Sequence, residues 1–475
     1  MYWKLNSGVA LRSWRLVPHA YYLRGDPFAR KLTPEQYEQL SRCDGAAELE
    51  PTPLLLELEA AGLAARCERP DPIEPWQAPR VCDNRYFPTM NWAVTGRCNY
   101  NCRHCFMAAD NAPVMAEFTW EECLALLDGC EACGVQSVTL TGGEPMLHPH
   151  FMDLCREIAR RGMDLAEITT NGSLLTRETL DALADVGQIP LIKISFDGLG
   201  HHDWMRSHPG AEENALAAIK LCRKKGFPVR VQMNVHRGNL ETLYPTARLL
   251  DELGVEELRV IRTTEAPRWA EQGGGLCLTL EEYYDAGLDF TRRYLADAPK
   301  MEVDIWQFLQ FWPQRKAYHL RPVELGCGTW RDTIPVCRGN RGKIAVTPEG
   351  EVVPCNQMSG YYLKHGMRLG SVKTAGLQPL LQAGPYLENV TATVGELFDR
   401  NPKCGGCEWR RLCLGGCRAI ALALTGDPMG SDPAKCAYFQ KGYVERTRAV
   451  FDALEGWRCV DRLDPKGGKE DEFDP

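Results

Sequence analysis

The sequence has no excess of positive charge and no long apolar run. Its 55 lysines and arginines stand against 63 aspartates and glutamates, which gives a formal net charge of −8. Nucleic acid is therefore not an expected partner, because binding to a phosphate backbone requires a basic surface. The longest apolar runs, such as Ala419 to Leu424, fall far below the roughly 18 residues of a membrane-spanning helix. We expect no membrane association either.

Signals for secretion and for repetition are missing as well. The first residues, Met1 to Ser7, show no basic region leading into a long apolar stretch and no small-residue cleavage site, so we expect a cytoplasmic protein. No internal repeat of fixed period is found. The 475 residues suffice for about three domains.

Cysteine is what the sequence has in excess, with 21 residues. This number is high for a cytosolic enzyme and low for a disulfide scaffold. Because thiols stay reduced in the cytoplasm, clustered cysteines there hold metal or carry out redox chemistry more often than they form disulfides.

Residues 1–80 are predicted to form a first, small unit. Residues 2–24 alternate apolar and polar residues in short bursts, as a small β-hairpin does. Two helices are expected after Thr33 and Thr52, because a threonine followed by proline is a typical helix start. With a closing strand, these elements favour a winged-helix-like module, although a packing extension without its own function fits the pattern equally well. The proline-rich residues 68–79 are predicted to be an extended linker.

Residues 90–265 alternate strand-like and helix-like segments. Helices are expected over Trp120–Cys133, Ala211–Gly226 and Thr242–Gly254. The expected strands are Trp92–Val94, Ser137–Thr141, Leu165–Thr170, Leu191–Phe196, Val229–Val235 and Leu258–Arg262. Six successive units predict an α/β fold, a parallel sheet closed or nearly closed into a partial (β/α)6 barrel. In such folds the functional site lies at the carboxyl ends of the strands.

The rest of the chain is predicted to comprise three segments. Residues 266–325 form an aromatic, helical bridge, with helical segments over Glu281–Tyr294 and Trp306–Trp312. Residues 326–445 are rich in cysteine and turns. Residues 446–475 are a last helix and a polar, frayed tail.

Three cysteines, Cys98, Cys102 and Cys105, directly follow the first predicted strand. Thiolates select zinc or iron–sulfur clusters, and this spacing lets three of them converge on one inorganic centre. Three protein ligands leave one metal position open, as in a reactive site. By itself the triplet is also compatible with half a zinc site or with coincidence.

Polar residues and glycines end the next strands. The residues concerned are Thr141, Gly142, Gly143 and Glu144 after the second strand, Thr170 and Asn171 after the third, Ser195 and Asp197 after the fourth, and Asn234 in the fifth. The two glycines free the backbone to approach a ligand, and a carboxylate lies beside them.

The cysteine triad with the aromatic residue after it, the Gly-Gly-Glu-Pro segment 142–145 and the six-unit barrel resemble the radical S-adenosylmethionine (SAM) superfamily. The resemblance implies a [4Fe–4S] cluster on Cys98, Cys102 and Cys105 whose fourth iron chelates SAM. It implies further SAM-binding residues at the strand ends. These are Thr141, Gly142, Gly143 and Glu144 around the amino group, Ser195 and Asp197 at the ribose, Val260 at the adenine, and Thr170, Asn171, Asn234 and Arg206 beside them.

A second cysteine region has the most distinctive spacing of the chain. Its halves are spaced wrongly for a zinc ribbon and resemble the SPASM extension of radical SAM enzymes. The resemblance implies two auxiliary [4Fe–4S] clusters, for three clusters in total. One is held by Cys404, Cys407, Cys413 and Cys436, and the other by Cys337, Cys355 and Cys417 with Cys327 as the fourth ligand.

The other ten cysteines need no metal. Five fall in helical segments and are predicted to be small buried hydrophobes, namely Cys123, Cys130, Cys133, Cys155 and Cys222. The remaining five have no partner at a useful spacing, namely Cys43, Cys67, Cys82, Cys277 and Cys459.

The resemblance implies peptide chemistry, because SPASM families mostly modify peptides or proteins with a 5′-deoxyadenosyl radical. Sulfatase-maturing members carry an aspartate base after the auxiliary cysteine, whereas Asn356 follows Cys355 here, which argues against formylglycine formation. Residues 1–80 resemble the winged-helix leader-recognition element (RRE or PqqD-like) of peptide maturases, which adds a leader to a sheet edge.

We therefore predict a maturase that cross-links a ribosomally made precursor peptide, with thioether formation from cysteine sulfur to carbon as the leading outcome. Carbon–carbon or other side-chain cross-links of the cyclophane type come second, and sulfatase-type Ser/Cys oxidation third. The expected partners are a precursor with its leader and an electron donor such as flavodoxin or ferredoxin. The non-enzymatic alternative is an iron–sulfur electron carrier or scaffold. Such a protein would not need the polar residues at the strand ends, 142–144 and 195–197.

Overall fold

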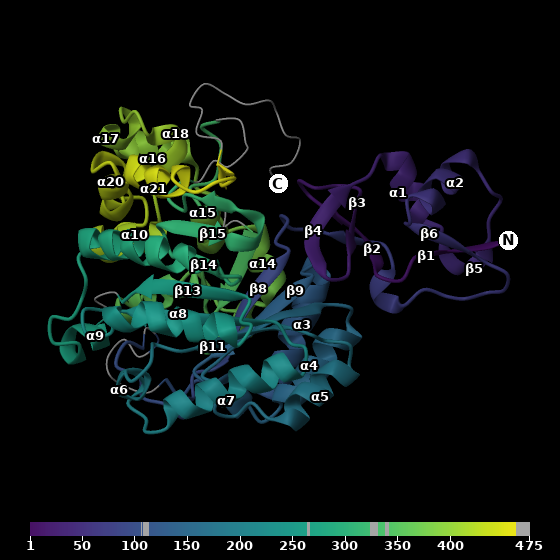
Figure 1. The fold of residues 1–475 in the computed structure, drawn as a ribbon. Helices are drawn as coiled ribbons and strands as arrows, with labels where there is room; N and C mark the ends of the chain where they lie inside the picture. Colours follow the sequence, from purple (N-terminus) through teal and green to yellow (C-terminus); the bar gives the residue numbers. More distant parts are fainter. Residues whose placement is uncertain (106, 108–113, 264–266, 324–330, 338–341, 462–475) are drawn as a thin grey trace.

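The computed structural model describes residues 1–105, 107, 114–263, 267–323, 331–337 and 342–461. Its centre is a twelve-stranded sheet in the order β18-β17-β8-β9-β10-β11-β12-β13-β14-β15-β16-β19 (Figure 1). The six strands β8 to β13 run parallel to their neighbours. Their bounds are Thr89–Thr95, Ser137–Gly142, Asp164–Thr170, Leu191–Ser195, Val229–Val235 and Glu257–Arg262. The predicted strands and the predicted α/β barrel are therefore confirmed.

Helices cover one face of this parallel sheet (Figure 1). They are α3 (Trp120–Cys133), α4 (Phe151–Arg160), α5 (Arg177–Asp185), α7 (Ala211–Lys224) and α8 (Leu243–Glu252). Helix α3 has the predicted bounds, because Thr119 and Glu122 form a capping box at its start. The buried faces of strands and helices share one large hydrophobic core. All five helical cysteines predicted to be buried lie in this core.

Further helical elements follow the strand ends, of which four are short and one, α10, has 17 residues. They are η2 (Pro145–Leu147), α6 (His202–Arg206), η3 (Leu240–Thr242), α9 (Pro267–Gln272) and α10 (Leu280–Ala296).

The segment after α10 differs from the prediction. We expected a helical segment over Trp306–Trp312, but β14 (Glu302–Ile305) and β15 (Leu309–Trp312) form an antiparallel hairpin there. Gln307 in the turn has a φ of 58°, which a helix does not allow. The apolar side chains of the hairpin enter the main core, so burial explains the aromatic composition. The sheet continues through β16 (Ala317–His319), after η4 (Pro313–Arg315), to β19 (Arg458–Cys459).

The N-terminal unit contains two sheets. The first has the order β5-β1-β6 and the second the order β4-β3-β2-β7. The strands are β1 (Tyr2–Leu5), β2 (Val9–Trp14), β3 (Ala20–Leu23), β4 (Asp26–Lys31), β5 (Asp44–Glu48), β6 (Ala64–Cys67) and β7 (Arg80–Cys82). The predicted hairpin is confirmed only for β2 and β3, because β1 pairs with β5 and β6 instead. Helices α1 (Pro34–Ser41) and α2 (Pro53–Ala60) start after Thr33 and Thr52 as predicted.

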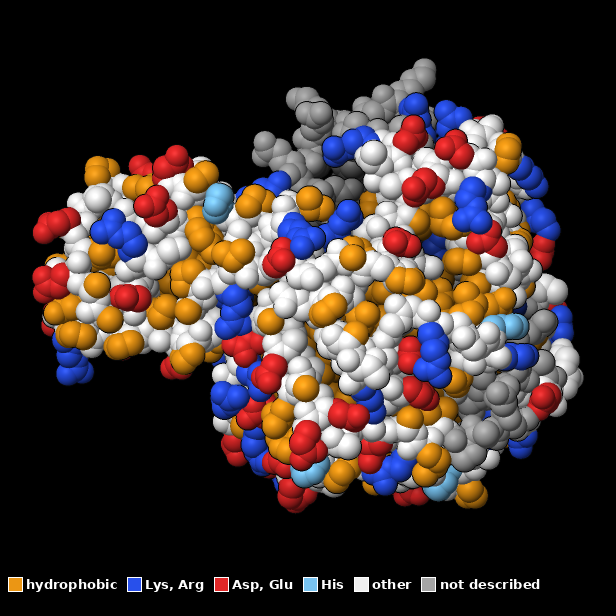
Figure 2. Space-filling model, turned by 180° about the vertical axis from the view of Figure 1, so that it is seen from behind, with side chains coloured by type: hydrophobic (Ala, Val, Ile, Leu, Met, Phe, Trp, Pro, Cys, Tyr) orange, Lys and Arg blue, Asp and Glu red, His pale blue; other side chains and the backbone are white. Residues whose placement is uncertain are grey.

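This unit projects from one side of the molecule (Figures 1 and 2). It is attached through the second sheet, where Trp14 Nε1 donates a hydrogen bond of 2.9 Å to the carbonyl of Cys133 at the end of α3. The expected linker is only partly extended, because it contains η1 (Pro75–Gln77) and buries Trp76. A long apolar side chain in a linker gains free energy by packing, and Trp76 packs on Gly162 after α4.

The C-terminal region covers the other end of the barrel (Figure 1). Strand β17 (Lys343–Val346) pairs in parallel with β8 and in an antiparallel manner with β18 (Val352–Val353). The short helices that follow are η5 (Asn356–Met358), α12 (Ser359–Lys364), α13 (Val372–Ala375), α14 (Leu377–Gln382), α15 (Pro385–Thr391), α16 (Val394–Arg400), α17 (Pro402–Gly405), α18 (Arg410–Cys413), α19 (Arg418–Thr425), α20 (Pro433–Gln440) and α21 (Tyr443–Asp452). The predicted frayed tail from Asp464 lies outside the described residues. No helix in the described ranges combines the length and the apolar character needed to cross a membrane.

Candidate metal and cofactor site

The loop that carries the first three cysteines is fixed by the end of β9. The backbone N–H groups of Gly143 and Glu144 donate hydrogen bonds of 2.8 Å to the carbonyls of Thr95 and Arg97. A Cβ atom on Gly143 would lie only 2.2 Å from the Arg97 carbonyl oxygen. The glycine therefore permits a close approach of two backbones. This differs from the predicted reason, which was an approach to a ligand.

Two further contacts hold the cysteine loop. Asn171, at the end of β10, donates a hydrogen bond of 2.9 Å to Asn99. The N–H of Arg103 donates one of 3.0 Å to the carbonyl of Met205 in α6. The predicted loop between the strand ends is thus tied to β9, β10 and α6.

The cysteine triad is brought together in this loop, with Cys98 exposed and Cys102 and Cys105 half-buried. Arg206 Nη1 lies 3.7 Å from Cys102 Sγ. Burial raises the pKa of the Cys102 thiol, the Arg206 guanidinium lowers it, and a charge on Cys105 raises it. The three thiols therefore lie within electrostatic reach of one another, beside a cation.

Glu144 connects the ends of β9 and β10. Its buried carboxylate accepts hydrogen bonds of 2.9 and 3.0 Å from the Thr170 hydroxyl and one of 2.9 Å from the Asn171 N–H. Burial raises the pKa of Glu144 to about 7, and these hydrogen bonds reduce the shift. The carboxylate has no cationic partner among these contacts, which suits a site that receives a cationic group.

Asp197, after β11, is the centre of a second buried network. Arg206 Nε lies 2.8 Å from its carboxylate, and the N–H of Asn234 donates a hydrogen bond of 3.0 Å to it. Burial raises the pKa of Asp197, but the neighbouring Arg206 and His202 lower it more, so that it lies well below its usual range. Arg206 thus bridges Asp197 and Cys102.

The other predicted residues lie on the same strand ends. Thr141, Gly142 and Ser195 are partly exposed there. The side chain of Val260 is buried in the main core, so only its backbone can face a ligand. Its carbonyl accepts a hydrogen bond of 3.0 Å from the Tyr283 hydroxyl.

Three buried polar residues of the site were not predicted. Asn239 donates hydrogen bonds of 2.8 Å to the carbonyls of Asp197 and Asn234 and thereby holds two strand ends together. His202 Nδ1 accepts a hydrogen bond of 2.9 Å from the Asp197 N–H. His104 Nε2 lies 3.1 Å from Asn234 Nδ2. No sequence pattern marks side chains that bind a distant backbone.

In the second cysteine region, the electrostatic contacts between thiols fall into two groups. Burial raises the pKa of Cys436, and charges on Cys404 and Cys407 raise it further. Cys436 in turn raises the pKa of Cys413, after the larger effect of burial. A separate set consists of Cys355, Cys417 and Cys337. Burial raises the pKa of Cys355 to about 12, and charges on the other two members add to the shift.

Buried charges lie between the two sets. Asp432 accepts a hydrogen bond of 2.7 Å from the Cys417 N–H. Arg418 is buried and donates to backbone carbonyls, including those of Pro428 and Gly430 at 2.9 and 2.8 Å. Lys435 is buried too. A buried cation near thiolates offsets the negative charge that a four-thiolate cluster carries.

These donor sets fit iron–sulfur clusters. In the described ranges no group of three or more His, Cys, Asp or Glu residues is arranged to hold a single metal ion. A [4Fe–4S] cluster makes no such demand, because each thiolate binds a different iron. Cys327, the predicted fourth ligand of one set, lies outside the described residues.

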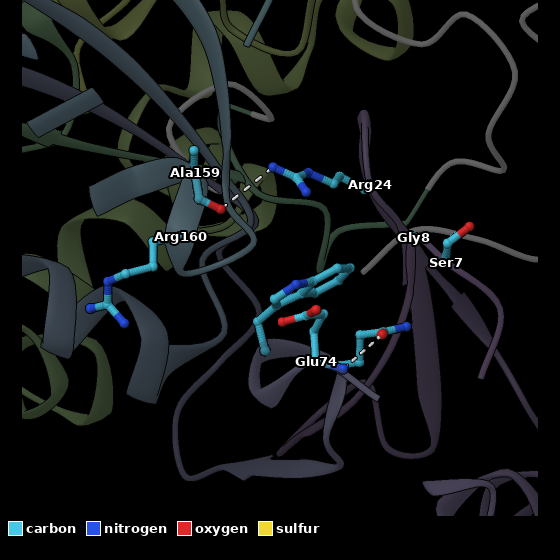
Figure 3. A pocket seen from close by; sticks show the side chains of 8 residues that line it. Ser7, Gly8, Arg24, Glu74, Ala159 and Arg160 are labelled. Atoms are coloured by element: carbon cyan, nitrogen blue, oxygen red, sulfur yellow. Dashed lines mark hydrogen bonds between the residues drawn. The ribbon is translucent and has the colours of Figure 1, made fainter. Parts of the chain in front are cut away.

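Two cavities lie apart from the strand ends. One of about 590 Å³ separates the N-terminal unit from α4, and Arg24, Glu74 and Trp76 line it together with Arg160 (Figure 3). The Arg24 guanidinium lies 5.7 Å from the centre of the Trp76 ring. A smaller cavity of about 60 Å³ lies between α12, the β17–β18 hairpin and the residues Met107 and Val114 beyond the triad.

Comparison with known proteins identifies the two cysteine-bearing regions. The model of the radical SAM superfamily matches residues 92–250, and that of the SPASM iron–sulfur cluster-binding domain matches residues 337–408. The chain therefore has a radical SAM domain followed by an SPASM domain.

The names of the sequence relatives indicate different substrates. An AdoMet-dependent heme synthase of Methanosarcina barkeri is 28% identical over 73% of this chain and 95% of its own length. A PqqA peptide cyclase of Bradyrhizobium diazoefficiens is 27% identical over 72% of this chain and 84% of its own length.

Solved structures share the fold. SuiB of Streptococcus suis, bound to its precursor peptide SuiA, matches with a TM-score of 0.64 at 13% identity, over 91% of this chain and 99% of its own. The protein anSMEcpe with bound AdoMet matches with a TM-score of 0.57 at 17% identity, over 77% of this chain and 99% of its own.

Proposed function

We propose that this radical SAM and SPASM chain modifies a ribosomally made precursor peptide by hydrogen abstraction, with thioether formation as the leading outcome. The observation that carries the proposal is the convergence of the cysteine triad with the polar ends of β9 to β12 at one edge of the barrel. Two further thiol sets lie in the SPASM region. A carrier protein needs the thiol sets but not the buried carboxylates at the strand ends.

The residues of the site have separate tasks in this proposal. Cys98, Cys102 and Cys105 hold a [4Fe–4S] cluster with one open iron position. Glu144 supplies negative charge to the SAM amino group, and Arg206 faces its carboxylate. The remaining proposed SAM contacts are Thr141, Gly142, Gly143, Thr170, Asn171, Ser195, Asp197, Asn234 and the backbone of Val260.

When bound, the reduced cluster and SAM supply a 5′-deoxyadenosyl radical that removes a hydrogen atom from the substrate. The protein orients SAM and keeps the strand ends in place through Asn171, Asn239 and Arg206. The SPASM thiols hold two auxiliary clusters, with Cys404, Cys407, Cys413 and Cys436 on one and Cys337, Cys355, Cys417 and Cys327 on the other. When bound, these clusters would supply acceptors for the electron that cross-linking releases, and the proposed electron donor is a flavodoxin or ferredoxin of the cytoplasm.

The N-terminal unit is proposed to bind the leader of the precursor. Strands β5 and β6 are the edge strands of the first sheet. The outer side of β5 is partly occupied, because the carbonyls of Asp44 and Gly45 accept backbone hydrogen bonds of 3.0 and 2.9 Å from the N–H groups of Ile73 and Asp71, which leaves the outer side of β6 for a leader. An extended peptide can add to such an edge through backbone hydrogen bonds. The match to SuiB over 91% of this chain has to include part of residues 1–80, and SuiB binds a precursor peptide.

A second candidate substrate is a tetrapyrrole, because a relative of 28% identity is named a heme synthase. That relative matches over 95% of its own length but leaves about a quarter of this chain without a counterpart. The PqqA peptide cyclase leaves about the same share of this chain without a counterpart, so the peptide is favoured by the edge strands of the N-terminal unit rather than by this coverage.

Reductive SAM cleavage tests the proposal directly. The reconstituted protein, reduced and given SAM, is expected to release 5′-deoxyadenosine, and a triple Cys98, Cys102 and Cys105 to Ala variant is expected to release none. The reconstituted protein without substitutions should bind about twelve iron atoms per chain, four for each of three clusters. Cys327→Ala should lower this content. Undiminished 5′-deoxyadenosine from the triple variant contradicts the proposal.

The peptide product is tested by co-expression. A precursor encoded beside the gene should lose a mass of about two hydrogens for each cross-link, since oxidative bond formation removes one hydrogen from each partner. Loss of this change on deletion of residues 1–67, with SAM cleavage retained, supports leader recognition by the N-terminal unit.

A further inference from the structure

The inner face of the barrel, below the strand ends, is lined with charged side chains. In β11, β12 and β13 the apolar residues alternate with polar ones, and the apolar residues lie in the core shared with the helices. Because successive side chains of a strand point to opposite faces, Lys193, Arg230 and Arg259 point to the inside.

These inner residues form a continuous ladder of ion pairs. The ladder runs through Lys193, Glu167, Arg230, Glu257, Arg259, Asp304 and Arg321. Neighbouring members are joined by nitrogen–oxygen distances between 2.7 and 3.9 Å. Their register on adjacent strands places them at similar heights.

The accessible part of the ladder is positive. The side chains of the three carboxylates are between 0 and 14% exposed, whereas those of the four cations are between 18 and 32% exposed. A molecule inside the barrel therefore meets the cations first. Glu302, a further inner-face carboxylate, lies near Arg315, which lowers its pKa against the larger effect of burial.

Lys343 adds a cation that the ladder does not neutralise. It starts β17 beside Thr89 of β8, and the next residue, Ile344, is in the apolar core, so Lys343 points to the inside. Its side chain is exposed, and no carboxylate of the described residues lies within ion-pair distance. The ammonium charge interacts with those of Glu167, Lys193 and Arg259 in the ladder and with the thiol of Cys355. It therefore lies between the ladder and Cys355.

The height of these cations suits a substrate that reacts at the strand ends. Lys193 precedes Ser195 by two residues, which is about 7 Å along a strand. Arg230 precedes Asn234 by four residues, about 13 Å. A group bound to Lys193 or Arg230 thus lies two to four residues, about 7 to 13 Å, below the strand ends, and Lys343, in register with Thr89, lies at the level of the start of β8.

We propose that the inner face of the barrel binds a carboxylate group of the substrate, with Lys343 as its direct partner and Lys193, Arg230 and Arg259 as the surrounding positive surface. The inference rests on the proposed function, because it takes the substrate to react at the strand ends. Two sources share this chemistry, an Asp or Glu side chain of a peptide and a propionate of a tetrapyrrole.

Binding to the reconstituted full-length protein in the presence of SAM tests the inference. Short fluorescein-labelled peptides are made in pairs that differ only by Glu or Gln at one position, and iron-coproporphyrin III is compared with its methyl ester. We expect the carboxylate form of at least one pair to bind roughly tenfold more tightly, as one charge-assisted hydrogen bond allows. The pair that shows the difference identifies the source.

Two variants make the test specific. Lys343→Met should remove most of the roughly tenfold preference, whereas Glu167→Gln should increase it several-fold, because it frees the charge of Lys193 and Arg230 while keeping hydrogen-bond acceptors. Lys364→Met, in an exposed lysine at the end of α12, is the matched control and should change nothing. A merely structural role of the ladder does not produce opposite effects in the first two variants.

The outcomes separate the two proposals. Equal affinity for charged and neutral probes, or an unchanged preference in Lys343→Met, overturns the carboxylate site even if SAM is cleaved. Failure of SAM cleavage in the same preparation overturns the proposed function. Thermal unfolding of each variant shows whether it is folded. If Glu167→Gln does not fold, the result for Lys343→Met decides the test by itself.

Discussion

Glu144 has the environment of a carboxyl group that is held ready for a cation. It is fully buried, and its hydrogen-bond partners are neutral groups, the Thr170 hydroxyl and backbone N–H groups. Burial raises its pKa to about 7 from an ordinary value of 4.5. Ionised Glu144 therefore costs free energy until a positive group arrives.

This pKa predicts a pH dependence of stability. Because the folded pKa lies above the unfolded one, the contribution of Glu144 is fully present below about pH 4.5 and is lost as the pH rises through about 7. Relative to Glu144→Gln, the metal-free wild type should lose roughly 3 kcal/mol of unfolding free energy over this window. Denaturant unfolding of both proteins from pH 5 to 8 measures it. A difference between the two proteins that stays constant with pH contradicts the assigned environment of Glu144.

Asp197 and Arg206 form a buried ion pair with side-chain exposures of 0 and 8%. Asp197→Asn leaves the guanidinium without its carboxylate, which typically costs about 3–5 kcal/mol. Denaturant unfolding of the metal-free protein should show this loss. The control is Asp289→Asn, in an exposed pair with Arg292, which should cost less than about 1 kcal/mol. Equal effects of the two variants refute a structural role for the buried pair.

Single residues also show which parts of the site could not be predicted from the sequence. Glu144 and Asp197 were predicted because carboxylates after parallel strands meet at one edge. Asn239 and His202 were not, because their partners are backbone groups of other segments. Only the folded chain brings such groups together, and an isolated Asn or His in a loop has no distinguishing spacing.

Among the secondary-structure elements, the parallel strands were predictable because each is a short apolar run between amphipathic helices. The β14–β15 hairpin was not, because an aromatic-rich segment of seven residues fits a buried helix and a buried strand equally well. The pairing of β17 with β8 was also beyond prediction, since about 250 residues separate the two strands and no local pattern records the contact.

The β9 end and the cysteine loop depend on each other through Gly143. In Gly143→Ala the new Cβ would meet the carbonyl oxygens of Arg97 and Gly96 at 2.2 and 2.5 Å, so the backbone that leads to Cys98 has to move. We expect a loss of about 2 kcal/mol and less iron bound per chain. Gly342→Ala is the control, because nothing lies within 4 Å of its Cβ position. Thermal unfolding and iron analysis after reconstitution measure both effects, and a Gly143→Ala protein with full stability and iron content rules out the contact.

The whole molecule consists of the barrel with its C-terminal region and an N-terminal unit that several contacts join to it. Trp14 binds the end of α3, the N–H of Gly25 donates a hydrogen bond of 2.6 Å to Asp164, and Trp76 covers Gly162. The cavity of about 590 Å³ lies between these contacts (Figure 3). Because none of them touches the cysteine triad, docking of the unit and chemistry at the strand ends should be separable.

Trp76→Ala tests this separation. Removing a buried Trp side chain typically costs about 3–5 kcal/mol, and here the cost falls on the contact between the unit and α4. Limited proteolysis should then cut within residues 68–79 much faster than in the wild type. Release of 5′-deoxyadenosine without a peptide should stay unchanged, whereas modification of a precursor should fall.

Trp3→Ala is the matched control, because Trp3 is buried in the apolar core between β1 and the helices of the N-terminal unit. It should loosen the first sheet but leave residues 68–79 protected, since the second sheet still holds the unit on the barrel. If both variants expose residues 68–79 equally, the unit and its contact with the barrel unfold together and docking is not a separate step. If Trp76→Ala abolishes SAM cleavage, the interface supports the barrel itself, because a change that acts only on peptide delivery leaves the reaction without peptide intact.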